Sequence, residues 1–217
     1  MSASSPATDG ILAPAKINLN LKIVGRREDG YHLLDSMVVF TAFGDRILVQ
    51  PSPQDSITSD GPFGDMLNEP PSENICAKAL TMFRLAGGRI GPLAIHIRKD
   101  IPVGAGLGGG SSNAAALLRW LQENTDGAVP DVSLSEIALS LGADVPACLA
   151  GRALQMTGIG ETITLMSIAP HGRILLASPR VFMPTKTIFT ALAQSDFAIG
   201  EGANAVSQSS AGSSAEL

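Results

Sequence analysis

Ile101-Pro-Val-Gly-Ala-Gly-Leu-Gly-Gly-Gly-Ser-Ser-Asn-Ala-Ala-Ala116 is the stretch around which this chain is organised. Five glycines fall within the seven positions from Gly104 to Gly110. Glycine adopts positive φ without strain and allows a ligand to approach the backbone closely. A loop of this composition therefore offers its backbone amides to a ligand.

The residues on either side of this loop predict regular structure. Before it, Leu93, Ile95 and Ile97 recur at every second position, as in a half-buried strand. After it, Ser111 or Ser112 is expected to cap a helix, whose apolar stripe is formed by Ala114, Leu117, Leu118 and Leu121. In this strand–loop–helix unit the loop amides and the helix N-terminus point the same way and form an anion site.

Two familiar phosphate motifs bear on which anion binds. A Walker loop needs Lys followed by Ser or Thr after its glycines, and this loop has neither at that place. Gly104, Gly106 and Gly109 satisfy the dinucleotide spacing G-x-G-x-x-G, which also requires an acidic residue about twenty positions later at the end of a second strand. Asp126 lies near that distance but follows a helix, which counts against dinucleotide binding. A ligand-free glycine turn is the minority interpretation.

Composition limits the class of protein. The 217 residues are 45% hydrophobic and 16% charged, enough for a globular core in one domain or two small ones. A net charge of −5 argues against nucleic-acid and anionic-membrane partners, which need a basic surface. Cys76 and Cys148 are far apart in apolar surroundings and predict buried thiols in a reducing compartment. With no signal peptide or membrane-length apolar run, a cytoplasmic location is expected.

The N-terminal third predicts β-strands. From Lys16 to Ile23 polar and apolar residues alternate, so that Ile17, Leu19, Leu21 and Ile23 should form a buried face. Lys16 and Asn18, two positions apart, would point to the same side. The turn 25–32 precedes strands expected at 33–43 and 46–50, separated by a turn at 44–45.

Later segments predict helices. Ser72 is expected to cap a helix that carries Ile75, Cys76, Ala79, Leu80 and Phe83 and stops at Gly87-Gly88. A capping box at 133–136 starts another helix, which Gly142 ends. Pro146 suits the first turn of a third, and places Asp144 at its N-terminus. Asp144 is then either a helix cap or a charged carboxylate beside a phosphate cleft, and position alone favours the cap.

From residue 151 the pattern changes to hairpins, with strands expected at 152–156, 162–166 and 173–177 and a helix from Pro184. We therefore divide the chain into a flexible N-terminus (1–12), an N-terminal domain (13–150), a partial C-terminal domain (151–199) and a low-complexity tail (200–217) expected to be disordered.

Three segments carry a family resemblance: Pro14–Leu19 with the turn Gly25-Arg-Arg-Glu-Asp-Gly-Tyr-His32, the loop Pro102–Ala115, and Leu141-Gly-Ala-Asp-Val-Pro146. Their order and composition resemble the GHMP kinases, and within them the members that phosphorylate a cytidyl-diphosphate polyol. The resemblance runs from about Ala13 to Phe189. It implies an α+β GHMP kinase fold, with an N-terminal domain like ribosomal protein S5 domain 2, containing a left-handed βαβ unit, and a ferredoxin-like C-terminal domain.

The resemblance also implies a reaction, in which the γ-phosphoryl group of ATP passes to the 2-hydroxyl of cytidyl-diphospho-methylerythritol with Mg²⁺ as cofactor. Asp144 would take the hydroxyl proton, and Lys16 would orient Asp144 and steady the transferring phosphate. The implied ATP site comprises Pro102, Val103, Gly104, Ala105, Gly106, Leu107, Gly108, Gly109, Gly110, Ser111, Ser112, Asn74 and Lys99. Ser112 would also lie near Mg²⁺. The implied substrate site comprises Asn18, Tyr31, His32, Thr185 and Phe189.

One departure from the family pattern affects the expected activity. Members normally continue well beyond this length and carry a third glycine-rich motif, whereas here the match dissolves after about Phe189 and the third motif is absent. An incomplete ferredoxin-like domain would leave apolar side chains poorly covered, so we expect reduced stability and weak or absent turnover. The alternatives are an inactive fragment that still binds nucleotide, and a dinucleotide-binding oxidoreductase.

Overall fold

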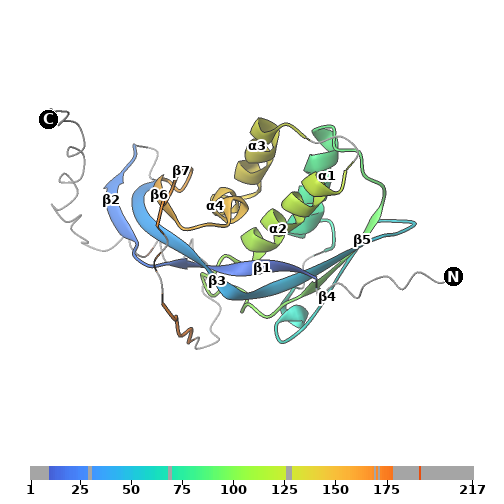
Figure 1. Ribbon diagram of the computed structural model, residues 1–217, viewed down its shortest axis with the longest axis horizontal. Coiled ribbons are helices and arrows are strands. Elements are labelled where there is room, and N and C mark those ends of the chain that lie inside the picture. Colours follow the sequence, from blue (N-terminus) through green and yellow to red (C-terminus); the bar gives the residue numbers. More distant parts are fainter. Residues whose placement is uncertain are drawn as a thin grey trace, which may run out of the picture.

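A computed structural model describes residues 10–28, 31–67, 70–125, 129–168, 170, 172–177 and 191. Within them the chain is a mixed α+β structure in which a single sheet carries the helices on one face (Figure 1). The strands are β1 (Ile11–Asn18), β2 (Lys22–Arg26), β3 (His32–Pro51), β4 (Ser56–Asp60), β5 (Leu93–Arg98), β6 (Leu154–Gly158) and β7 (Thr162–Leu165). The helices are α1 (Ile75–Leu85), α2 (Gly109–Glu123), α3 (Asp131–Leu141) and α4 (Val145–Ala150), with a short 3₁₀ turn at Gly64–Met66. No helix in the described ranges is both long and apolar enough to cross a membrane.

The 20-residue strand β3 is the centre of the sheet. Its first part pairs with β2 on one side and β6 on the other, and its later part with β1 and β5, all antiparallel. Strand β4 adds to β5 in parallel, with α1 in the connection, and β7 adds to β6. Each half of β3 has two neighbouring strands. Strand β3 therefore fixes the position of β1 and also that of the hairpin formed by β6 and β7.

The turn predicted at 44–45 is wrong, because β3 runs straight through it. At Gly44 the strand β1 passes so close that an added Cβ would lie 2.3 Å from the carbonyl oxygen of Ala13. Glycine here serves close strand packing rather than a reversal of the chain. Asp45, which a turn would expose, is fully buried.

The continuous strand predicted from 16 to 23 is also wrong. Pairing with β3 stops at Asn18 and resumes at Lys22, and Leu19 and Leu21 are 44% and 51% exposed. A register shift between Pro14 and Lys16 marks a bulge, which turns both Ala15 and Lys16 inward. The bulge therefore buries the lysine side chain that strict alternation assigns to the polar face.

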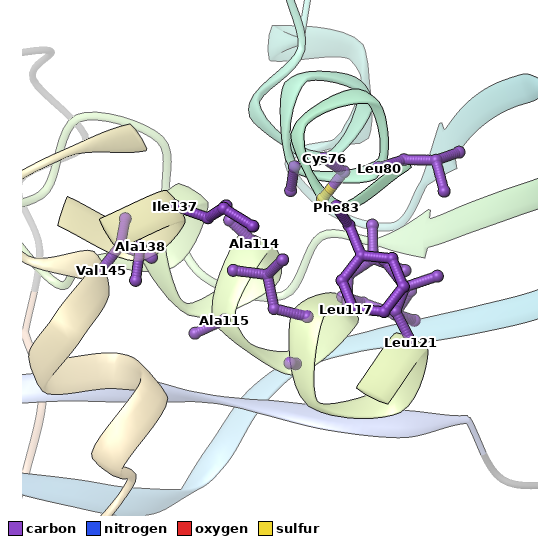
Figure 2. Close-up of a cluster of buried hydrophobic side chains, with 14 of the residues drawn as sticks. Cys76, Leu80, Phe83, Ala114, Ala115, Leu117, Leu121, Ile137, Ala138 and Val145 are labelled. Atoms are coloured by element: carbon purple, nitrogen blue, oxygen red, sulfur yellow. The ribbon is translucent and has the colours of Figure 1, made fainter. Parts of the chain in front are cut away.

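The main core lies between the helices and the sheet. The predicted stripe of α2 is buried in full, and Figure 2 shows Leu117 and Leu121 packed beside Phe83 and Leu80 of α1. Ile137 and Ala138 of α3 and Val145 of α4 extend the same cluster. The helix α2 therefore lies at the centre of the helical layer, and its N-terminus is held by the packing of its whole length.

Three predicted helix starts need correction. Asn74, not Ser72, caps α1, and its side chain accepts a hydrogen bond from the backbone N–H of Cys76 at 2.9 Å. Helix α3 begins at Asp131 after Pro130, ahead of the predicted capping box. Helix α2 begins at Gly109 with Gly108 as its N-cap, so neither Ser111 nor Ser112 caps it. The predicted ends at 87–88 and Gly142 are confirmed.

The hairpin predicted after residue 151 is confirmed as β6 and β7, and it joins the same sheet as β3. The strand predicted at 173–177 is wrong, since those residues form no strand. The helix expected from Pro184 and the tail from 200 lie outside the described residues. The division into two domains stays a prediction, and β6 and β7 are hydrogen-bonded into the N-terminal sheet.

Candidate active site

The glycine loop forms an open cradle at the start of α2. Gly104, Gly106 and Gly108 have φ of 73°, 73° and 64°, a region that side-chain-bearing residues rarely adopt. Apart from its two chain neighbours, no described residue has an atom within 4 Å of the position that a Cβ at Gly106 would take. The loop conformation thus depends on glycine, and it leaves backbone exposed where an anion can approach the helix N-terminus.

Strand β1 holds the middle of this loop. The backbone N–H of Lys16 donates to the carbonyl oxygen of Leu107 at 2.9 Å. A Cβ on Gly108 would lie 3.1 Å from the Cβ of Lys16 and 3.3 Å from its Cε. The bulge in β1 therefore brings the Lys16 side chain directly against the loop.

Lys16 and Asp144 form an ion pair across the site, with 2.9 Å between Lys16 Nζ and Asp144 Oδ1. The Lys16 side chain is 4% exposed and that of Asp144 is 39% exposed, so a buried ammonium lies beneath an accessible carboxylate. Asp144 occupies the N-cap position of α4, but its side chain caps nothing. The Asp144 carboxylate is thus engaged by Lys16 and does not cap the helix, and its role in catalysis stays a prediction.

The short helix α4 is anchored at its other end by α2. Arg119 donates from Nη1 to the carbonyl oxygens of Cys148 and Leu149, at 2.7 and 3.0 Å. These carbonyls belong to the last turn of α4, where a cation is favourable. Since α2 begins at the glycine loop and carries Arg119, one helix sets the separation between the loop and Asp144.

A hydrogen-bond chain orients Lys16 from the side of the sheet. Lys16 Nζ donates to Asn18 Oδ1 at 3.1 Å, and Asn18 Nδ2 donates to Ser36 Oγ at 2.6 Å. The fully buried Ser36 donates to the carbonyl oxygen of Asn20 at 2.6 Å. The ammonium is thus held from two directions, by Asp144 and by Asn18.

A single cavity of about 660 Å³ joins the cradle to the ion pair. Its wall contains most of the predicted ATP residues, namely Pro102 to Ser111, Asn74 and Lys99, together with Lys16, Asn18 and Asp144. Leu21, Ile23, Leu34 and Met156 continue it toward β2, β3 and β6. The volume is in the range of small-molecule sites, and several polar side chains line the wall.

Ser112, Tyr31 and His32 are predicted site residues that do not line this cavity. Ser112 is 1% exposed and is not among the residues on the cavity wall. Tyr31 and His32 lie where β3 begins, beyond the end of the wall, and Tyr31 is 59% exposed. Thr185, Phe189 and Asp126 lie outside the described residues. The roles assigned to these residues stay predictions.

Cys148 lies close to the ion pair without being reactive. It is 1% exposed, and burial raises the pKa of its thiol to about 12, with the Asp144 charge adding to the effect. The thiolate is the nucleophilic form of cysteine. Cys148 is therefore a packing residue, as predicted for both cysteines, and Cys76 is buried as well.

Sequence reasoning missed four residues that support the site: Asp45, Asn113, Ser36 and Arg119. Asp45 was assigned to a turn, and Asn113 stood one position beyond the predicted cradle. Ser36 and Arg119 lie in segments whose patterns indicate only a strand and a helix. The sequence offers no signal for these residues, because their contacts follow from tertiary packing. Among the described residues no group of three or more His, Cys, Asp or Glu side chains is placed to hold a metal ion.

Comparison with known proteins agrees with this geometry. Residues 74–152 match the family described as GHMP kinases N terminal domain. The chain is 44% identical over 194 residues to a 4-diphosphocytidyl-2-C-methyl-D-erythritol kinase of Agrobacterium fabrum, covering 87% of this chain and 65% of the relative. It is 42% identical over 183 residues to the kinase of the same name from Chelativorans sp., covering 84% and 62%.

Solved structures give the same result. The crystal structure of a 4-(cytidine 5'-diphospho)-2C-methyl-D-erythritol kinase superposes with a TM-score of 0.60 at 36% identity, covering 84% of this chain and 70% of that one. The chain spans somewhat less than two thirds of the length of the curated relatives, 65% and 62% in the two cases above.

Proposed function

This chain belongs to the GHMP kinase family, and on that basis we propose that it transfers the γ-phosphoryl group of ATP to the 2-hydroxyl of 4-diphosphocytidyl-2-C-methyl-D-erythritol. The observation that carries the proposal is the single cavity in which a glycine cradle faces the Lys16–Asp144 pair. Phosphoryl transfer from a nucleoside triphosphate to an alcohol needs both the glycine cradle and the Lys16–Asp144 pair in one site. Relatives of the same name at 40–44% identity support the choice of acceptor.

Asp144 is the residue we propose to accept the proton of the attacking hydroxyl. Its carboxylate is accessible and lies on the cavity wall, and Lys16 fixes its orientation from below. A positioned general base typically contributes about 10²–10⁴-fold to a rate. The methylene groups of Lys16 lie against Gly108, and its ammonium, which ends this side chain, can stabilise the negative charge on the transferring group.

The cradle fits a triphosphate. Its positive-φ glycines leave the backbone bare, and the N-terminus of α2 adds a favourable dipole for an anion. Phosphoryl transfer depends mainly on positioning and charge neutralisation, which such a cradle provides. In the part of the chain described after α2, residues 131–141 form a helix where the dinucleotide fold requires a second strand with an acidic end, which argues against the oxidoreductase alternative.

The described residues fit Mg²⁺ only in part. Phosphate-bound Mg²⁺ is usually held by one or two carboxylates and the phosphate oxygens. Asp144 is the sole acidic residue among the described residues of the cavity wall, so the ion would be held largely by phosphate oxygens. Bound Mg²⁺ would neutralise phosphate charge. The proposed contact of Ser112 with the ion has less support, because Ser112 is buried away from the wall.

The acceptor site extends from Asp144 toward β2 and β3. Asn18 is on the cavity wall, and its amide is already held by Lys16 and Ser36, so it can offer a fixed polar group. We propose that Tyr31, His32, Thr185 and Phe189 hold the cytidine base, as the family resemblance implies. Recognition of the base then takes place away from the reacting hydroxyl.

Coupled measurement of ADP release and ³¹P NMR of the product tests the function. The purified chain is supplied with ATP, Mg²⁺ and 4-diphosphocytidyl-2-C-methyl-D-erythritol, and in parallel with the 2-deoxy analogue of that acceptor. We expect ADP and a new phosphomonoester only with the hydroxyl present. Saturable ATP binding without any product would support the nucleotide-binding fragment, and saturable NAD binding in place of ATP binding would support the oxidoreductase.

A further inference from the structure

Three buried polar side chains form a cluster beneath the glycine loop, away from the Lys16–Asp144 pair. Asp45 of β3 is fully buried, Lys99 after β5 is 2% exposed, and Asn113 of α2 is 3% exposed. Burying charge is costly unless each group is paired and hydrogen-bonded. Each of the three buried side chains therefore needs hydrogen-bond partners.

Asp45 accepts four hydrogen bonds. Its Oδ1 accepts from the backbone N–H groups of Asp100 and Ile101, at 2.9 and 2.8 Å. Its Oδ2 accepts from Lys99 Nζ and, at 2.9 Å, from Asn113 Nδ2. Lys99 Nζ also donates to Asn113 Oδ1 at 3.1 Å, which closes the cluster.

These bonds tie both ends of the glycine loop to one carboxylate. The chain leaves β5 after Arg98, passes Ile101 at the stem of the loop and enters α2, where Asn113 lies one turn inside the helix. Between these ends the glycines have no side chains to pack. The ion pair also lies directly under the helix start, since a Cβ on Gly109 would lie 3.1 Å from Lys99 Nζ.

We propose that Asp45 is a positioning residue for the phosphate cradle, acting through Ile101 and Asn113 rather than by contact with the ligand. The proposal rests on the proposed function for its ligand, ATP. A cradle gains affinity when its amides are held in the bound arrangement before the ligand arrives. Asp45 provides that arrangement because it fixes the spacing between the loop stem and the helix. Its pairing with Lys99 also keeps that ammonium on the cavity wall.

The test separates a positioning role from a general stabilising one. Asp45→Asn keeps the shape of the side chain but removes the charge that holds Lys99. Asn113→Ala removes the bonds from α2 to Asp45 and Lys99 and leaves the Asp45–Lys99 ion pair, so it serves if Asp45→Asn fails to fold. Leu121→Ala is the matched control, because Leu121 is fully buried on the same helix, three turns from the loop. For each variant, hydrogen exchange of the peptide 99–112, the melting temperature and the Kd for ATP are measured.

We expect Asp45→Asn to speed exchange of the loop peptide at least tenfold and to weaken ATP binding about tenfold or more. Asn113→Ala should show the same two effects at about threefold each. Leu121→Ala should lower the melting temperature with both quantities within twofold of wild type. Loop exchange and Kd within twofold of wild type in the variants that fold would overturn the proposal. If the wild type binds no ATP, the proposed function fails, and the exchange measurements alone still decide the role of Asp45.

Discussion

Gly108→Ala is the substitution whose outcome follows most directly from the geometry of the cradle. Gly108 has φ of 64°, and a left-handed conformation costs a residue with a side chain roughly 1–2 kcal/mol. The new Cβ would lie 3.1 Å from the Cβ of Lys16 and 3.3 Å from its Cε. Lys16 cannot yield freely, because its backbone is bonded to Leu107 and its ammonium to Asp144.

The two effects together give a loss of about 2 kcal/mol in the free energy of unfolding, with side-chain strain adding to the backbone cost. For a chain of this size that lowers the melting temperature by about 4–8 °C. Because the contact displaces Lys16, turnover should fall by about tenfold or more, since small misplacements of reacting groups are costly. Circular dichroism follows the melting, and ADP release follows turnover.

Gly110→Ala is the matched control in the same loop. Its Cβ would have only Ile75 Cγ2 nearby, at 3.8 Å, and Gly110 lies within α2. Alanine in a helix is more stable than glycine by roughly 0.5–1 kcal/mol, so the melting temperature should rise slightly. A Gly108→Ala protein that melts at or above the wild-type temperature would show that the loop conformation described here is not the one in solution.

Three further predictions concern the anchor of α4, the ion pair of 2.5 Å between Arg84 Nη1 and Asp55 Oδ2, and the Cys148 thiol. Arg119→Met should reduce turnover at least tenfold with little change in ATP affinity, because α4 and Asp144 lose their anchor while the cradle is kept. Turnover is measured by steady-state kinetics and ATP affinity by calorimetry, and equal losses in the two would contradict this prediction. Asp55→Asn should remove about 0.2–1 kcal/mol of stability. The hydrogen bond from the Arg84 guanidinium lowers the pKa of Asp55 below its usual 3.8. The difference in unfolding free energy between wild type and Asp55→Asn is therefore fully present above pH 3.8 and disappears as the pH falls through the lower pKa of the folded state. Denaturant titrations from pH 7 to 2 that show a constant difference would refute the pairing. The Cys148 thiol should resist Ellman's reagent at pH 8 in the native protein and react after unfolding in guanidinium, because burial raises its pKa to about 12. Rapid labelling of Cys148 in the native protein, located by mass spectrometry, would contradict its burial.

Local sequence patterns were sufficient for the elements whose side chains face one way along their length. The apolar stripe of α2 and the alternation of β5 depend on one periodicity each, and both are confirmed. The glycine loop is predictable from the sequence, because few structures other than an anion-binding loop need five glycines directly before a helix. These features are local, so a single chain segment contains the information.

The patterns failed where a distant segment sets the conformation. Gly44 predicts a turn by itself, but the approach of β1 makes it a strand residue. The bulge before Lys16 arises from pairing with β3 and buries the lysine, and the break in pairing between Asn18 and Lys22 exposes Leu19 and Leu21. A bulge has no fixed sequence signal, and it shifts the face of every residue that follows.

The candidate site shows the same division. Asp144 and Lys16 were identified through the family resemblance, since position alone favoured a helix cap for Asp144. That the carboxylate turns to Lys16 instead depends on a partner 128 residues away. Asp45 was missed for a similar reason, because its four donors come from the loop stem at residues 99–101 and from Asn113 of α2.

Turnover by Asp144→Asn, measured beside its affinity for ATP, tests the central claim most directly. The amide keeps the size of the side chain and the hydrogen-bonding oxygen near Lys16, but it cannot take a proton from the acceptor hydroxyl. We predict that ADP release with 4-diphosphocytidyl-2-C-methyl-D-erythritol falls by about 10²–10⁴-fold while the Kd for ATP changes by less than about threefold. Turnover within tenfold of wild type would contradict the assignment of Asp144 as the proton acceptor opposite the glycine cradle.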